Sequence, residues 1–212
     1  VASTLAVPTD VGDPELVNAL FAQVEEHYGR LDVLFNNAGR GAPAVLFEDL
    51  EYADWQSVVD VNLTGVFLCS QAAFKIMKDQ QPHGGRIINN ASGAGKVAPG
   101  KNLPLGAYSA SKHAVVAITK QMGLELADHG ILVNCVCAGI VDTPLWELID
   151  REVARLRNVP VGSVKEAAVT GIPLGRIQQP EDVAGLVAFL TSSDAGYMTG
   201  QTYNVCGGLL PY

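Results

Sequence analysis

Residues 31–39 read LDVLFNNAG, a short apolar run that stops at a glycine. Such a run, bounded by a turn signal, is typical of a strand buried in the core of a sheet. A long helical pattern follows over residues 52–79, which predicts one long or kinked helix. The stretch therefore predicts one strand–turn–helix unit of an α/β protein.

The same alternation continues on both sides of this unit. Strands are predicted at 3–10, 130–139 and 202–208, and residues 85–95 are predicted to be a strand that runs into a loop. Helices are predicted at 13–29, 107–128 and 180–192, with two short helices inside 144–176. Asp13 is the expected N-cap of the first helix and Pro14 its first residue. Uniformly apolar strands between helices predict an α/β fold with a doubly wound parallel sheet, covered by helices on both faces, in a single domain spanning 1–212.

Composition argues against several classes of protein. The net charge of −8 and the pI near 4.9 disfavour a nucleic-acid partner, which requires a concentrated positive surface. The uninterrupted apolar stretches are shorter than the roughly twenty residues of a membrane span, and Val1 opens directly on strand-like sequence, so no secretory leader is expected. The cysteines at 69, 135, 137 and 206 are too scattered for zinc, which predicts no metal and buried, reduced thiols in a cytoplasmic protein.

Polar residues stand where predicted strands and helices end, which is where parallel sheets bind ligands. Tyr108 and Lys112, in YSASK, lie four residues apart on one helix face, and a nearby cation lowers a phenol's pKa from its usual value of about 10. Ser92 ends a strand, so its hydroxyl can hold a substrate oxygen against the phenol. Asn62, in VNLTG, is either part of a relay from the lysine to solvent or a satisfied buried amide. Alone, the Tyr–Lys spacing is a weak signal.

Four motifs in this order, NNAG, VNLTG, IINNAS and YSASK, resemble the short-chain dehydrogenase/reductase family over essentially the whole chain. The resemblance implies a Rossmann-like fold and a catalytic tetrad of Asn62, Ser92, Tyr108 and Lys112. Tyr108 would exchange a proton with a substrate oxygen while a hydride passes between the substrate carbon and a nicotinamide. Lys112 would lower the pKa of the tyrosine and bind the nicotinamide ribose.

The resemblance also implies a set of cofactor contacts. They are Asp10 at the adenine, Asn37, Ala38 and Gly39 at the adenosine ribose, and Ile140 and Thr143 at the carboxamide, with Val11, Gly139, Tyr108 and Lys112 completing the set. Ala138 stands where the family usually has proline, and a modest effect is expected because no functional group is lost. The residue that selects between NAD and NADP is not in this sequence, so the choice is not readable from it, and NAD is the family-level preference.

One departure from the family pattern is large. The family begins with a glycine-rich turn, T-G-x-x-x-G-x-G, whose backbone N–H groups bind the cofactor pyrophosphate, and this sequence starts at what is expected to be the third strand. Two explanations stay open. Either the sequence lacks its native N-terminus, or the protein holds a dinucleotide weakly and serves as a catalytically silent binding or scaffold protein.

Residues 144–176 are expected to form a mobile substrate lid. The stretch GIVDTPLWELID resembles the subgroup that acts on small diols, acetoin and sugar alcohols, which implies a small alcohol or ketone substrate in contact with Ser92, Ala94, Tyr108, Leu145 and Trp146. Trp146 either closes an apolar wall over the substrate or simply packs within the lid. Helices 52–79 and 107–128 carry broad apolar faces, and the family resemblance implies that they pair between subunits of a homotetramer or homodimer.

Overall fold

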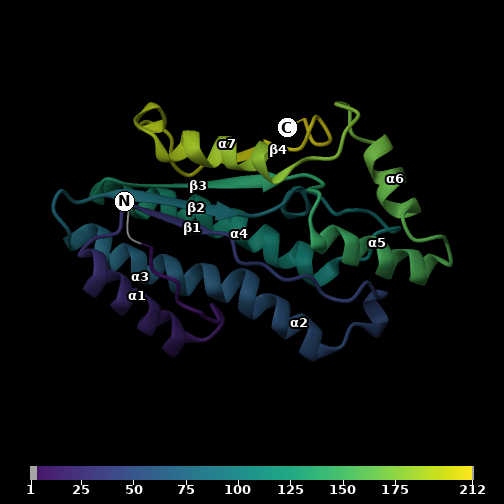
Figure 1. Ribbon diagram of the computed structural model, residues 1–212, viewed down its shortest axis with the longest axis horizontal. Coiled ribbons are helices and arrows are strands. Elements are labelled where there is room, and N and C mark those ends of the chain that lie inside the picture. Colours follow the sequence, from purple (N-terminus) through teal and green to yellow (C-terminus); the bar gives the residue numbers. More distant parts are fainter. Residues whose placement is uncertain (1–3, 212) are drawn as a thin grey trace.

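The computed structural model describes residues 4–211 and has a four-stranded parallel sheet at its centre (Figure 1). Its strands, in spatial order, are β1 (Val33–Asn36), β2 (Gly85–Asn90), β3 (Ile131–Ala138) and β4 (Thr202–Val205). Each neighbouring pair is parallel, with Val33 opposite Arg86 and Cys135 opposite Thr202. The predicted parallel sheet is confirmed.

Helices cover both faces of the sheet. They are α1 (Pro14–Tyr28), α2 (Tyr52–Val59), α3 (Gly65–Asp79), α4 (Gly106–Glu125), α5 (Pro144–Arg157), α6 (Ser163–Thr170) and α7 (Pro180–Thr191). Figure 1 shows α7 on one face and α1, α3 and α4 on the other. The helical pattern at 52–79 is one continuous helix interrupted by a π-helical segment, Asp60–Thr64, that joins α2 to α3.

The two faces are packed by alternate residues of the same strand. Ile87 of β2 packs in a cluster with Phe21 of α1 and Met77 of α3, whereas Ile88 packs with Leu190 of α7. Successive side chains of a strand point to opposite faces, so a run of apolar residues is needed where both faces are covered. This is why apolar residues succeed one another in the middle of β2 and along most of β3.

The start of α1 follows the sequence prediction. The Asp13 side chain accepts hydrogen bonds from the backbone N–H groups of Glu15 and Leu16, at 2.8 and 3.2 Å, and Pro14 is the first helical residue. These contacts satisfy N–H groups that have no partner inside the helix. The helix ends at Gly29, whose φ of 69° lies in the left-handed region that glycine tolerates.

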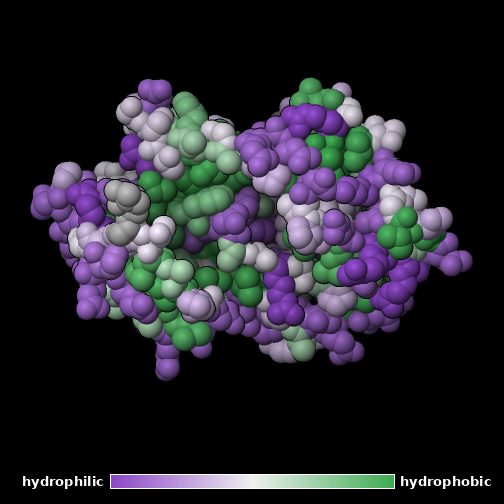
Figure 2. Space-filling view, in the orientation of Figure 1, coloured by the Kyte–Doolittle hydropathy of each residue, from purple (hydrophilic) through white to green (hydrophobic). Residues whose placement is uncertain are grey.

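Two strand predictions were wrong in part. Residues 4–10 are extended but belong to no strand, because no neighbouring backbone pairs with them, and Ser3 lies outside the described residues. The strand β1 was expected to be buried, yet Val33 and Phe35 are 39% and 36% exposed. Their face is opposite to that of Leu34, and none of the described helices covers it. Figure 2 shows hydrophobic residues gathered in a hollow over this region, below α7.

Helix α4 ends at Glu125, three residues before the predicted end, because Ala127–His129 form a 3-10 turn closed by Gly130 at a φ of 68°.

A second difference from the sequence prediction concerns the hydropathy of the helix at residues 52–79. By length and composition alone, Tyr52–Asp79 is long and apolar enough to cross a membrane, although its uninterrupted apolar runs are short. Core helices of soluble proteins pass the same test, and Ala73 and Met77 of this helix are fully buried in the core.

A buried polar chain connects the sheet to its helices below the site. Asn36 of β1 donates to Ser70 of α3 at 2.9 Å and to the side-chain oxygen of Asn89 of β2 at 2.8 Å. Asn89 in turn donates to Thr119 of α4 at 2.9 Å, and Thr119 donates to the carbonyl of Val115. Because every buried member is hydrogen-bonded, the chain fixes β1, β2, α3 and α4 relative to one another.

Candidate active site

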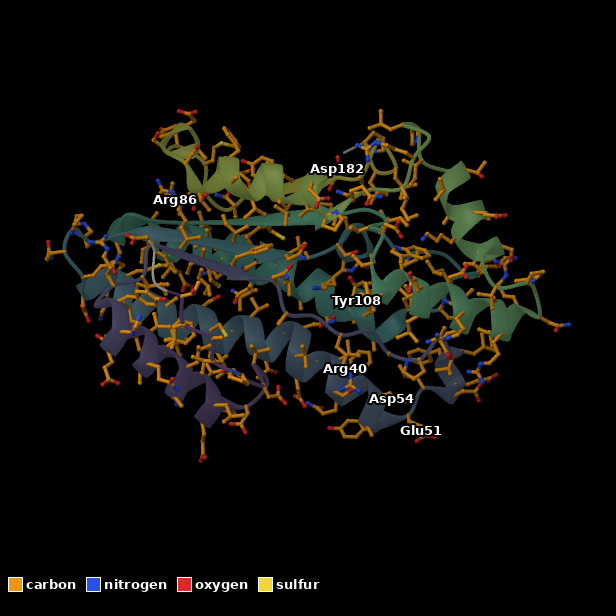
Figure 3. All side chains as sticks on the ribbon, in the orientation of Figure 1. Arg40, Glu51, Asp54, Arg86, Tyr108 and Asp182 are labelled. Atoms are coloured by element: carbon orange, nitrogen blue, oxygen red, sulfur yellow. The ribbon has the colours of Figure 1, made fainter. Side chains whose placement is uncertain are left out.

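The sequence-predicted residues converge at the carboxyl ends of the strands. Residues 37–39 follow β1, Ser92 follows β2, and residues 139–143 follow β3, while the first turns of α4 carry Tyr108 and Lys112. Figure 3 shows Tyr108 in the middle of the molecule, at the start of α4. The structure therefore brings the four predicted catalytic residues to one edge of the sheet.

Lys112 is buried, with 4% of its surface exposed. Its ammonium donates to the carbonyl oxygen of Asn90 at 2.8 Å and lies 5.7 Å from the centre of the Tyr108 ring. Burial lowers the pKa of Lys112 to about 8, and the neighbouring thiols of Cys135 and Cys137 partly oppose that change. A cation is thus held beneath the phenol, and its charge is sensitive to pH just above neutrality.

The phenol of Tyr108 has a raised pKa, chiefly because it is buried, and a hydrogen bond with Ser92 lowers that pKa in part. The expectation that Lys112 lowers the pKa of the phenol below its usual value is therefore wrong for the protein without cofactor. The ammonium is already hydrogen-bonded to Asn90, and desolvation of the phenolate outweighs the other effects. Consequently, Tyr108 holds its proton at neutral pH.

A close contact between backbones sets the position of Ser92. The turn Gly93–Gly95 packs directly on α4, so that a Cβ atom on Gly95 would lie 2.6 Å from the carbonyl oxygen of Lys112. Only glycine permits this approach. The Ser92 hydroxyl accepts from the N–H of Ala94 at 3.2 Å, which starts the turn. Ser92 and the half-buried Ala94 are thereby fixed against the helix that carries Tyr108.

Asn62 lies in the π-helical segment and is fully buried. Its side-chain oxygen accepts from the N–H of Arg40 at 2.7 Å, and its amide nitrogen donates to the carbonyl of Arg40 at 2.9 Å and to the hydroxyl of Ser111 at 3.1 Å. Ser111 donates in turn to the carbonyl of Tyr108 at 2.7 Å. These contacts match the satisfied-amide alternative and link the loop after β1 to α4. The relay to solvent stays a prediction.

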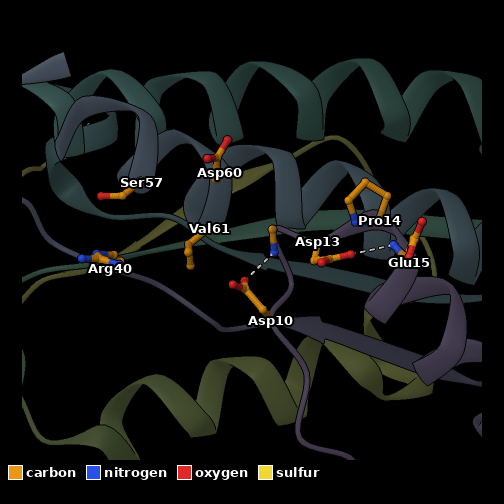
Figure 4. A pocket seen from close by; sticks show the side chains of 9 residues that line it. Asp10, Asp13, Pro14, Glu15, Arg40, Ser57, Asp60 and Val61 are labelled. Carbon is orange, nitrogen blue, oxygen red and sulfur yellow. Dashed lines mark hydrogen bonds between the residues drawn. The ribbon is translucent and has the colours of Figure 1, made fainter. Parts of the chain in front are cut away.

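The adenine-side residues lie apart from this cluster, around a cavity of about 600 Å³ (Figure 4). Asp10, Asp60 and Val61 line it, and the Asp10 carboxylate accepts from the N–H of Gly12 at 2.9 Å. Val11 does not line this cavity and packs instead against Gly65 at the start of α3, where a Cβ would lie 2.7 Å from its side chain.

The cavity volume falls in the usual range for small-molecule sites. Between this cavity and the phenol, Asn37, Ala38 and Gly39 are exposed at the end of β1. A Cβ on Gly39 would lie 3.7 Å from both the Lys112 ammonium and the Asn62 oxygen. The loop after β1 thus runs alongside the lysine.

The nicotinamide side is expected at the loop after β3. Gly139, Ile140 and Thr143 follow that strand, and Thr143 is the N-cap residue of α5. Gly139 approaches β4 so closely that a Cβ would lie 2.9 Å from the Cα of Cys206. This backbone lies beside the turn that carries Ser92, since β2 and β3 are neighbours. The arrangement fits the nicotinamide end of the cofactor.

The expected lid is packed onto the rest of the protein. Val153 of α5 and Val164 of α6 cluster with Ala44, and Asp150 accepts from the N–H groups of Gly162 and Lys165 at 2.6 and 2.7 Å. These contacts fix α5 and α6 to each other.

The two lid residues expected to touch substrate have different surroundings. Leu145 lies 3.2 Å from the position of a Cβ on Gly41, so it reaches the loop after β1. Trp146 is half-buried, and within residues 4–211 its indole makes no hydrogen bond. The wall and packing interpretations of Trp146 both stay open.

Sequence reasoning missed three residues that touch this site. Ser111 lies inside the YSASK motif, and its small polar side chain before the lysine is a usable signal. Arg40 follows NNAG and is the basic residue that lines the adenosine cavity among acidic neighbours. Gln178 hydrogen-bonds the N–H of Gly139 at 3.0 Å, and nothing in the local sequence indicates that contact.

All four cysteines are free and buried. Among the described side chains, no group of three or more His, Cys, Asp or Glu is placed to hold a metal ion.

The structure thus places together a half-buried phenol, a serine hydroxyl beside it and a buried cation. A family model described as enoyl-(acyl carrier protein) reductase matches residues 1–210. The chain belongs to the short-chain dehydrogenase/reductase family, and it is an NAD(P)-dependent oxidoreductase. This finding favours the enzyme over the scaffold alternative.

Relatives share sequence over nearly the whole chain. The monensin polyketide synthase ketoacyl reductase of Streptomyces virginiae is 43% identical over 201 residues, covering 94% of this chain and 75% of the relative. The (S)-acetoin-forming diacetyl reductase of Staphylococcus epidermidis is 38% identical over 207 residues, 97% of this chain and 79% of the relative. The structure of F189W actinorhodin polyketide ketoreductase with NADPH has a TM-score of 0.89 and 40% identity, covering 96% of this chain and 77% of that one.

Proposed function

We propose that the protein reduces a ketone to a secondary alcohol, with Tyr108 as the acid and a reduced nicotinamide as hydride donor. The observation that supports this direction is the raised pKa of the buried phenol. A phenol that keeps its proton at neutral pH is an acid ready to protonate a carbonyl oxygen, and the ketoreductase relatives support the same direction. When bound, the cofactor supplies the hydride to the carbonyl carbon.

The residues divide the remaining work. The Ser92 hydroxyl and the Tyr108 phenol both donate to the substrate carbonyl oxygen, and the phenol gives up its proton as the oxygen becomes a hydroxyl. The phenolate that remains is stabilised by the Lys112 ammonium, 5.7 Å from the ring centre, and regains a proton from solvent. Charge develops on the phenol only during the reaction, so the buried cation acts on the transition state more than on the bound substrate.

We propose NADPH as the reductant and a β-keto acyl compound or similar apolar ketone as the substrate. An apolar cavity of about 350 Å³ beside the first turn of α4 supports the apolar substrate. Ala107 and Ser109 line it together with Pro43, Phe47 and Leu103, whereas Tyr108 and Ser92 do not, so this cavity holds the apolar part of the substrate rather than the reacting carbonyl. A polyol bound there would bury hydroxyl groups without hydrogen-bond partners, which weakens its binding. The ketoacyl reductase relative and the NADPH-containing structure support the same choice.

The small-ketone alternative is a diol, acetoin or polyol substrate with NAD, and the diacetyl reductase relative favours it. Under either alternative we propose that α6 and α5, which carries Leu145 and Trp146, form the substrate lid, and that the cavity at Asp10 completes the cofactor site as its adenosine end. We also propose a cytoplasmic homotetramer. The four reduced cysteines support that compartment, and the exposed Phe67 on α3 and Leu124 on α4 support assembly.

A substrate panel tests the proposal. We expect the absorbance of the reduced nicotinamide to fall with an acetoacetyl thioester or a cyclic ketone, and to fall faster with NADPH than with NADH. Turnover of diacetyl at equal concentration is expected to be about ten times slower, because each small apolar group that fills a hydrophobic pocket lowers the transition-state free energy by about 1–3 kcal/mol. If the protein turns over diacetyl or a sugar alcohol but neither the acetoacetyl thioester nor the cyclic ketone, the small-ketone alternative is the correct one. Failure of either dinucleotide to raise the melting temperature would contradict cofactor binding altogether.

A further inference from the structure

We propose that Gln178 is a positioning residue that holds the loop after β3, residues 139–143, in the geometry needed to bind the nicotinamide end of the cofactor. The inference rests on the proposed function, because it takes that loop to be the nicotinamide side of the site. Gln178 lies in the segment just before α7 and is far from these residues in sequence.

Three hydrogen bonds connect Gln178 to the loop. Its side-chain oxygen accepts from the N–H of Gly139 at 3.0 Å, its backbone N–H donates to the carbonyl of Ile140 at 3.0 Å, and its carbonyl accepts from the N–H of Asp142 at 2.8 Å. Val141 and Gln178 also form an isolated parallel bridge. Among residues 4–211, no other side chain from outside the loop bonds to the loop backbone.

The segment that carries Gln178 is itself anchored on α7. Arg176 makes a two-pronged contact with Asp182, 2.7 Å at each nitrogen, and the N–H of Gln179 donates to the same carboxylate at 2.8 Å. Arg176 as hydrogen-bond partner is the largest cause of the lowered pKa of Asp182. The N-terminus of α7 thus serves as a fixed point from which Gln178 reaches across to the loop (Figure 3 labels Asp182).

The environment of Gln178 indicates that its position has a function beyond stability. The residue is only 7% exposed, and its side-chain nitrogen is buried without a hydrogen-bond partner. A buried donor left unpaired is destabilising, and an apolar side chain of the same length removes that cost. The Gly139 N–H is shared between the Val205 carbonyl at 2.8 Å and the Gln178 side-chain oxygen at 3.0 Å, so the amide adds a second acceptor that ties the loop to the segment before α7.

The held loop leads directly into the lid. Thr143 is the N-cap residue of α5, and the Asp142 carboxylate pairs with Lys165 of α6 at 2.6 Å. A shift of the loop therefore displaces both the carboxamide-side residues and the start of the lid. Loosening it is expected to weaken cofactor binding more than it slows the chemical step, because Tyr108 and Lys112 are on a different element, α4.

Two substitutions and a control test this role. Gln178→Met removes the acceptor at similar length, and Gln178→Glu keeps an acceptor oxygen. Gln201→Met makes the same change at an exposed residue. For Gln178→Met we expect faster hydrogen exchange over residues 139–143 in the cofactor-free protein, a KM for the dinucleotide raised about tenfold as for one lost hydrogen bond, a kcat within about twofold and an unchanged or higher melting temperature. Gln178→Glu restores slow exchange, and Gln201→Met behaves as the parent.

Parent-like exchange and KM in Gln178→Met would overturn the proposal, as would equal exchange in the methionine and glutamate variants. If Gln178→Met is insoluble, Gln178→Glu alone carries the test. Fast hydrogen exchange over residues 139–143 in Gln178→Glu would then contradict the proposal. The outcome is separate from that of the proposed function. If the reductase assignment is wrong, Tyr108→Phe retains turnover. If only the role of Gln178 is wrong, Tyr108→Phe is inactive and hydrogen exchange over residues 139–143 is the same whichever side chain stands at position 178.

Discussion

Tyr108→Phe is expected to lower the rate of carbonyl reduction by about 10²–10⁴-fold, the usual contribution of a positioned general acid. The change removes one oxygen and leaves the ring in place. Without the phenol, Ser92 can still donate to the substrate oxygen but no group at this site delivers a proton to it. Binding of the dinucleotide is expected to change little, since Lys112 and the strand-end loops remain.

The measurement is single-turnover oxidation of the reduced nicotinamide, with the dissociation constant of the dinucleotide followed separately. Tyr197→Phe is the matched control, because Tyr197 is fully exposed and lies in the turn after α7. Retention of more than a tenth of the parent rate in Tyr108→Phe would assign the proton transfer to another group and remove the basis of the mechanism.

Lys112→Met is expected to separate activity from stability. The rate falls by about 10²-fold or more, the effect of losing one preorganised group at the developing charge, yet the fold is not weakened at neutral pH. The pKa of Lys112 is lowered from 10.5 to about 8 by burial, so the unfolded chain binds this proton more tightly than the folded protein. The charge therefore costs stability below about pH 8, by an amount on the order of 3 kcal/mol at about 1.4 kcal/mol per pKa unit.

The sign of this effect fixes its pH dependence. The cost to the parent is fully present below the folded pKa of about 8 and disappears as the pH rises toward the unfolded value of 10.5. Lys112→Met should melt at or above the parent temperature at neutral pH, and the difference should vanish at high pH. Reduction by the parent should decline above about pH 8, as the ammonium loses its proton.

Lys120→Met is the control for this comparison, because Lys120 is exposed on the same helix. The control should show the parent's rate and melting curve. A Lys112→Met protein with normal turnover would show that the buried cation is dispensable. A large fall in its melting temperature at neutral pH would show that the hydrogen bond to Asn90 outweighs the cost of burying the charge.

Local sequence was sufficient for some of this site. The four-residue spacing of Tyr108 and Lys112 follows from helix periodicity and the position of Ser92 from a strand end. The resemblance to the family joined these residues and Asn62 into one site, and the structure places them together. The direction of the tyrosine pKa does not follow, because it depends on burial. That burial is produced by the turn after β2 packing on α4 through Gly95, a contact no local pattern indicates.

The fold shows the same division. Central strands were predicted from their apolar runs, and the cap at Asp13 from residue type. Residues 4–10 have the composition of a strand but no partner backbone, and Phe35 of β1 is apolar yet 36% exposed. Both differences concern which neighbours a segment has. Gln178 is a further example, since its contact with Gly139 joins segments 39 residues apart and neither one signals the other.

The central claim is that Tyr108 is a half-buried phenol that keeps its proton until a substrate accepts it. The most direct test is a pH titration of protein labelled with ¹³C at the tyrosine ζ carbons, with the Tyr108 signal assigned by its absence in Tyr108→Phe. We predict that this signal shows a protonated phenol throughout the neutral range and titrates above the ordinary value of about 10. A Tyr108 signal that titrates near neutrality in the cofactor-free protein would contradict the account.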